Sequence, residues 1–183
     1  MKRFVFSIII FVFLLFMCLP IGTSHAINIL YQPMDLADTT PGEDLWQYSY
    51  TVSDYTFNMD YGFTIYFDYT LYANLENPPP FVNADWDPIV WQPDLSIPDD
   101  GVYDALAWVD AASLADPFTV NFEWLGGGTP ASQFFDVYDP SWNTIASKET
   151  APIPEPATAL LLLSGIGIFG LERLRRRAKK YRA

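Results

Sequence analysis

Carboxylates are the side chains best suited to do chemistry in the central segment, residues 27–151. This segment contains no His, Cys or Arg, which excludes a Ser-His-Asp triad, a Cys-His nucleophile pair and a zinc site of imidazole or thiolate ligands. Two carboxylates suffice for glycoside hydrolysis when burial keeps one protonated, and Asp85 with Asp87, or Asp68 with Glu123, are candidates. Acids are so frequent here that such pairs arise by chance. We therefore expect no enzyme, and keep a small carboxylate-dependent glycosidase as the third hypothesis.

Calcium binding is a second use of carboxylates, because Ca²⁺ prefers several oxygen ligands supplied by turns. Asp94, Asp99, Asp100 and Asp104 cluster around Gly101. Their spacing does not fit an EF-hand loop, and turn acids more often serve solubility. Calcium at these four residues is the one cofactor that the sequence leaves open, and no other cofactor is predicted.

Three tryptophans offer a different chemistry. Trp86, Trp91 and Trp142 lie in stretches rich in Pro and Asp, which indicates loops. Flat indole faces beside carboxylates suit stacking on sugar rings whose hydroxyls are bound alongside. The alternative is that these rings cap the ends of a hydrophobic core.

The charge of the central segment is strongly one-sided. Of the 22 Asp and Glu, only Glu155 and Glu172 fall outside it, and of the ten Lys and Arg only Lys148 falls inside. The segment therefore carries a net charge of −19, which repels nucleic acid and anionic lipid headgroups. The only Cys, Cys18, precedes the segment, so we expect no disulfide in it.

Alternating side chains predict the β-strands that must position these residues. Apolar and polar residues alternate with a period of two, as in strands with one buried face, in four stretches: 46–52, 63–71, 118–124 and 135–137. Turn signals separate them at Asn77–Pro80, Asp99–Gly101 and Asp139–Pro140, and Gly126–Pro130 is expected as a hairpin loop. Only Tyr103–Leu114 has weak helical spacing, enough for one short turn. The pattern predicts an all-β fold, an antiparallel sandwich or jelly roll.

The N-terminal residues 1–26 have the layout of a signal peptide. Lys2 and Arg3 precede an uncharged apolar run, and Ser24 and Ala26 place small residues at positions −3 and −1 of a cleavage site after Ala26. An uncleaved anchor is the alternative. A lipoprotein using Cys18 is disfavoured because bulky residues precede it.

The C-terminal residues 152–183 form three blocks. Prolines between 152 and 156 favour an extended linker that holds the domain off the membrane. The apolar stretch of about 157–171 predicts a short transmembrane helix of about 22 Å. A basic cluster then keeps the end in the cytoplasm: Arg173, Arg175, Arg176, Arg177, Lys179 and Lys180.

These three blocks, with Pro154, Glu155 and Pro156 at their head, resemble the PEP-CTERM sorting signal. The resemblance implies a Gram-negative source, recognition by an exosortase-type membrane protease, a single-pass intermediate in the inner membrane, and delivery to the cell surface or an exopolysaccharide matrix. A plain membrane anchor is the alternative. Residues 63–68 and 132–138 also faintly resemble other PEP-CTERM ectodomains, which adds a fold expectation without an activity.

The sequence thus predicts a signal peptide (1–26), a β-sandwich ectodomain (27–151) and a sorting signal (152–183). The leading functional hypothesis is a non-catalytic surface or matrix protein that associates with polysaccharide. A protein-binding adhesion module is the alternative.

Overall fold

The computed structural model describes residues 27–154, which contain ten strands and no helix. The strands are β1 (Asn28–Asp35), β2 (Leu45–Ser53), β3 (Gly62–Phe67), β4 (Tyr72–Ala73), β5 (Trp86–Trp91), β6 (Gly101–Ala107), β7 (Phe118–Trp124), β8 (Phe134–Tyr138), β9 (Thr144–Glu149) and β10 (Ala151–Pro152). The all-β prediction is confirmed for these residues. The predicted signal peptide and C-terminal helix lie outside them.

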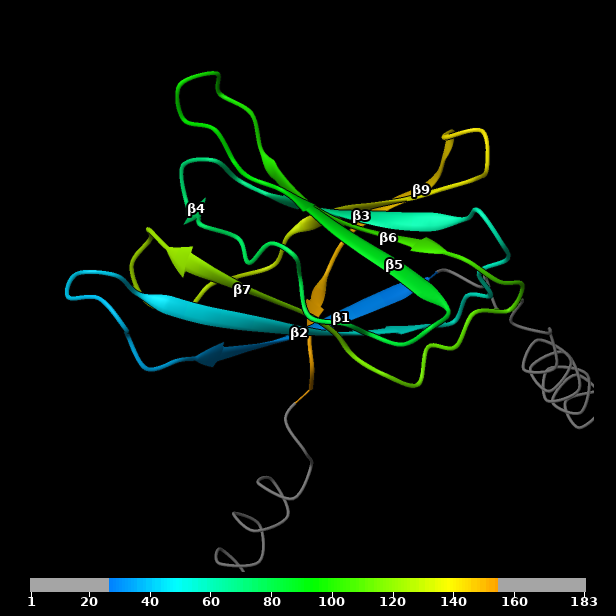
Figure 1. Cartoon of the computed structure of the whole chain (residues 1–183), viewed down its shortest axis with the longest axis horizontal. Coiled ribbons are helices and arrows are strands. Elements are labelled where there is room, and N and C mark those ends of the chain that lie inside the picture. Colours follow the sequence, from blue (N-terminus) through cyan, green and yellow to red (C-terminus); the bar gives the residue numbers. More distant parts are fainter. Residues whose placement is uncertain (1–26, 155–183) are drawn as a thin grey trace, which may run out of the picture.

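Two five-stranded sheets stack as the layers of a sandwich (Figure 1). The first sheet has the order β10-β1-β2-β7-β4 and the second has the order β5-β6-β3-β8-β9. All neighbouring strands are antiparallel except β1 and β10, which pair in parallel. The loop between β5 and β6 projects beyond the sheets (Figure 1).

Aromatic rings from both sheets fill the space between the layers. Tyr48 of the first sheet stacks on Phe122 with ring centroids 4.8 Å apart, and Phe63 of the second meets Phe118 of the first edge-on at 5.0 Å. Such pairs contribute about 0.5–1.5 kcal/mol each beyond the apolar area that they bury. The inward positions predicted from the alternation at 46–52 and 118–124 face this core as expected.

The strand predicted at 63–71 is shorter than its pattern. The alternation runs from 63 to 71, but β3 ends at Phe67. Asp68 Oδ1 accepts hydrogen bonds from the backbone N–H and the hydroxyl of Thr70, at 2.7 and 2.6 Å. This local side-chain turn competes with the sheet and stops the strand.

Three further local predictions were wrong. Tyr103–Leu114 forms no helical turn, because Tyr103, Ala105 and Ala107 alternate into the core along β6, between β5 and β3. Gly126–Pro130 is no hairpin loop, because β7 and β8 belong to different sheets and this segment crosses between the layers. The turn expected at Asp99–Gly101 lies at 95–98, closed by a bridge between Asp94 and Asp99.

The end of the described chain is tied to the sandwich. Leu30 pairs with Ala151 and Tyr31 with Pro152, and the Ile153 N–H donates to the Tyr31 carbonyl at 3.0 Å. The segment expected as a linker therefore begins inside the first sheet.

Candidate functional site

The outer faces of the two sheets differ in chemistry. The first sheet presents mainly small uncharged polar side chains along β2 and β7, among them Ser49, Thr51, Thr119 and Asn121. The outward positions of the second sheet carry aromatic and aliphatic side chains beside carboxylates. We call this surface, formed by the outward residues of β5, β6, β3 and β8, the aromatic face.

One row of the aromatic face, which we call the aromatic row, crosses four strands and consists of Trp91, Val102, Tyr66 and Phe134. Trp91 opposes Val102, Val102 opposes Tyr66, and the β3–β8 register continues to Phe134. Trp91 is 57% exposed and Phe134 is 63% exposed. Neighbouring strands lie about 4.8 Å apart, so the row extends over about 14 Å, enough for several sugar rings in line.

The next row is polar and internally hydrogen-bonded. Asp104 Oδ2 accepts from the Thr64 hydroxyl at 2.6 Å, and Asp136 accepts from the Tyr66 hydroxyl at 3.0 Å and the Ser147 hydroxyl at 2.5 Å. Burial, followed by the hydrogen bond to Asp136, raises the pKa of Tyr66 to about 12. These bonds fix the Tyr66 ring, one of the four side chains of the aromatic row.

Asp104 is the one acidic side chain of the aromatic face that is buried. Only 4% of it is exposed, and its Oδ1 accepts from the Tyr138 hydroxyl at 2.8 Å. Burial raises the pKa of this carboxyl above its ordinary value, and the hydrogen bonds from Thr64 and Tyr138 oppose that rise. Asp104 therefore supports the face from below and is almost inaccessible to solvent.

Trp142 adds a second aromatic surface beside the polar row. Its ring stacks on Tyr138 with centroids 4.8 Å apart and planes 23° from parallel, and it stays 69% exposed. Its φ of 61° is left-handed, a costly conformation for a bulky residue. The turn that enforces it is held by Asp139, which accepts hydrogen bonds from the backbone N–H groups of Ser141 and Asn143.

Trp86 corrects part of the sequence prediction for glycan stacking. Its ring is 3% exposed and packs edge-on against Phe57 and Phe118, and its indole N–H donates to the Ser113 carbonyl. Trp86 follows the alternative considered above, capping the core at the start of β5. Trp91 and Trp142 are exposed as predicted, on the same side of the sandwich.

The four aspartates of the predicted calcium site are not brought together as ligands. Asp94 is engaged by Ser96, and Asp100 accepts from the Tyr69 N–H, while Asp104 belongs to the aromatic face. Among residues 27–154, no three acidic side chains are placed to hold a metal ion.

The candidate catalytic pairs also serve local structure. Asp85 accepts from the Ser113 N–H, while Asp87 is exposed on β5. Asp68 forms the turn after β3, and Glu123 accepts from the Asn74 amide.

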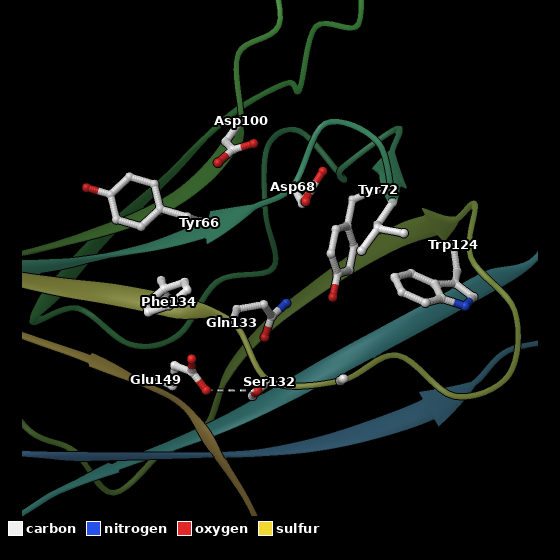
Figure 2. A pocket seen from close by; sticks show the side chains of 11 residues that line it. Tyr66, Asp68, Tyr72, Asp100, Trp124, Ser132, Gln133, Phe134 and Glu149 are labelled. Carbon is white, nitrogen blue, oxygen red and sulfur yellow. Dashed lines mark hydrogen bonds between the residues drawn. The ribbon is translucent and has the colours of Figure 1, made fainter.

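A pocket of about 390 Å³ adjoins the aromatic row (Figure 2). Tyr66 and Phe134 belong to both, and Gln133 lies at the inner wall. The sequence prediction missed all three residues. Tyr66 and Phe134 carried a signal, since both are aromatic at outward positions of an alternating strand, whereas Gln133 lies between strands and carried none.

The terminal sites fall at or beyond the described ends. Pro154 is exposed, one residue after the last backbone hydrogen bond to the first sheet. Ser24, Ala26, Glu155, Pro156 and the basic cluster lie outside the described residues. Within 27–154 there is no helix long and apolar enough to cross a membrane.

Comparison with known proteins identifies one sequence motif. Residues 152–178 match the PEP-CTERM protein-sorting motif, which confirms the resemblance inferred from the sequence. No curated protein matches the chain. Among solved structures, a type II cohesin domain from the cellulosome of Acetivibrio cellulolyticus is similar at 10% identity, covering 70% of this chain and 92% of that domain, with a TM-score of 0.39.

Proposed function

We propose that this chain, whose PEP-CTERM motif marks it as an extracellular protein sorted by an exosortase, is a non-catalytic surface or matrix module that binds polysaccharide through its aromatic face. The observation that carries the proposal is the row from Trp91 to Phe134, in which both end rings are exposed and the Tyr66 ring between them is half-buried.

The chemistry of this face fits a sugar chain. Exposed aromatic rings offer apolar area to the C–H faces of sugar rings, and their edges and neighbours supply hydrogen-bonding groups. Asp136 lies at an outward position two residues from Phe134, accepts from the Tyr66 hydroxyl, and can accept further hydrogen bonds from sugar hydroxyls. With a net charge of −19 between residues 27 and 151, the face disfavours anionic partners such as nucleic acid.

A binding assay with matched variants tests the proposal. The full chain in detergent micelles is incubated with a panel of insoluble neutral polysaccharides, and the bound fraction is measured. Trp91→Ala and Trp142→Asn are expected to weaken binding about tenfold each, equivalent to about 1.4 kcal/mol. Asparagine is chosen at 142 because it tolerates the left-handed backbone.

Leu125→Ala is the matched control. Leu125 is 52% exposed but follows β7 of the first sheet, away from the aromatic face. It is expected to bind like the parent chain. Equal binding by all four proteins would refute the role of the aromatic face.

A second candidate function, binding another protein, rests on the projecting loop between β5 and β6. Leu95 and Ile97 at its tip are 73% and 71% exposed, and apolar tips of this kind suit insertion into a protein partner. Under this alternative, Leu95→Ser with Ile97→Ser abolishes surface retention, whereas Trp91→Ala leaves it intact.

Processing of the C-terminal segment on the way to the cell surface can be tested separately. Exosortase processing would remove the segment after the Pro-Glu-Pro motif, so intact mass of protein released from the cell surface is expected to lack residues 157–183. Released protein that keeps this segment would contradict the sorting route and favour a plain anchor.

A further inference from the structure

The inner wall of the pocket beside the aromatic row contains a side-chain amide whose N–H has no hydrogen-bond partner among residues 27–154. Gln133 is 4% exposed, and its Oε1 accepts from the Tyr50 hydroxyl at 3.0 Å. Its backbone is fixed by reciprocal bonds with Thr150, at 3.0 and 2.8 Å. Its Nε2 faces the Tyr72 hydroxyl but meets no acceptor with hydrogen-bond geometry among residues 27–154. A buried donor left unpaired destabilises the fold, and an oxygen acceptor of a ligand in the pocket would supply the missing hydrogen bond.

Figure 2 shows the Gln133 amide nitrogen directed toward Tyr72, across the interior of the pocket. The Tyr72 hydroxyl pairs with that of Tyr48 at 3.2 Å, and Tyr48 donates to the Ala131 carbonyl at 2.7 Å. Burial raises the pKa of Tyr72 to about 12, against the opposing interactions with the Tyr48 hydroxyl and, more weakly, with the Gln133 amide. This wall is therefore rigid and uncharged, and it offers an N–H to an acceptor.

Three carboxylates form the outer rim of the same pocket: Asp68, Asp100 and Glu149. All three are exposed. Each uses one oxygen inside the protein, accepting from Thr70, Tyr69 and Ser132 respectively. The second oxygen of each has no partner among residues 27–154.

No basic side chain of the described residues balances this rim. Lys148 is the only Lys or Arg between residues 27 and 151, and its ammonium group bonds the Ile27 carbonyl at 3.2 Å. A neutral ligand would leave three carboxylates without a counter-charge, and an anionic sugar would be repelled. A ligand with a positive charge at the rim and an oxygen acceptor deeper inside matches both features.

We propose that this pocket binds one amine-bearing sugar unit, whose ammonium group faces Asp68, Asp100 and Glu149 and whose ring or hydroxyl oxygen accepts from Gln133 Nε2. Phe134, 63% exposed, provides an apolar surface for the sugar face at the junction with the aromatic row. The proposal rests on the proposed function and specifies which sugar chemistry the site selects.

Calorimetry on the full chain in detergent micelles tests the selection. The probes are a disaccharide of glucosamine with free amines, its N-acetylated counterpart and a uronic acid disaccharide, at mildly acidic pH where the amine is protonated. The amine form is expected to bind at least about tenfold more tightly than the acetylated form, and the uronic acid is expected not to bind. Equal affinity for the first two, or no binding of the amine form, would overturn the proposal.

Two variants with the same change of charge identify the rim. Neutralising it with Asp68→Asn, Asp100→Asn and Glu149→Gln is expected to abolish the preference for the amine. The control changes three exposed acids elsewhere, Asp35→Asn, Asp38→Asn and Asp116→Asn, and is expected to keep it. If the control loses the preference equally, the attraction is diffuse and the pocket is not the site.

The inner donor has its own variant. Gln133→Met keeps the side-chain length and removes the N–H, so both sugars are expected to bind more weakly by a similar factor. If this variant fails to fold because Tyr50 loses its acceptor, the rim variants still decide the matter. Loss of neutral polymer binding on Trp91→Ala with no disaccharide binding would retain the proposed function and reject this pocket.

Discussion

At the scale of single residues, local environment decides what each acid and each ring can do. Asp104 and Asp100 are four positions apart, yet one is buried beneath the aromatic face and the other lies on the pocket rim. Trp86 and Trp91 lie on one strand and differ in the same way, because five positions along a strand place them on opposite faces. The residue type therefore indicates which interactions a side chain can make, but not whether that side chain is buried or exposed.

Asp104 makes a prediction about pH. Because burial raises its pKa in the folded state, the folded protein binds more protons than the unfolded chain between the ordinary value of 3.8 and the raised value. The free energy of unfolding therefore falls as pH rises through this window, and the stabilisation is complete below 3.8. Asp104→Asn is expected to flatten this slope in melting curves between about pH 3.8 and 7.

The exposed Asp116→Asn serves as the control for this slope, because it removes the same charge outside the aromatic face. It is expected to preserve the difference in melting temperature between acid and neutral pH. If Asp104→Asn and the parent chain show the same slope, Asp104 does not titrate in the way its burial implies.

At the scale of elements, close approach between strands shapes the aromatic face. Gly62 on β3 lies under the side chain of Tyr138, which reaches across it to Asp104. A β-carbon at this position would overlap the Tyr138 hydroxyl and lie 2.6 Å from the Ala105 carbonyl oxygen. The glycine thus allows Tyr138 to lie flat and support Trp142.

Gly62→Ala is therefore expected to destabilise the protein by about 1–3 kcal/mol, the usual cost of overpacking, and to weaken binding that depends on Trp142. Urea unfolding measures the first effect and the polysaccharide assay the second. Gly127→Ala is the control, since a β-carbon there meets no atom within 4 Å. Equal free energies of unfolding for the two variants would mean that Tyr138 can move away from position 62 without destabilising the protein.

At the scale of the whole molecule, the excess of acid is the dominant property. Residues 27–151 contain twenty acidic side chains and a single lysine. Repulsion among the acidic side chains therefore destabilises the compact state. Because repulsion between exposed charges is screened by salt, this destabilisation is expected to respond to ionic strength.

Salt should therefore raise the melting temperature of the protein. Raising NaCl from about 0.01 to 0.15 M shortens the screening length from about 30 to 8 Å and is expected to stabilise the fold. Calcium chloride at matched ionic strength is expected to add nothing further. A larger shift with calcium than with magnesium at the same ionic strength would support the calcium site predicted at Asp94, Asp99, Asp100 and Asp104.

The sequence by itself determined the β-class, the inward faces of β2, β3 and β7, and the sorting motif, because each depends on a local pattern: a period of two, or a fixed order of short blocks. Tertiary structure alone decided that β7 and β8 belong to different sheets and that Gln133 and three distant acids line one pocket. These depend on which strands pair, and pairing is a long-range property that no local spacing encodes.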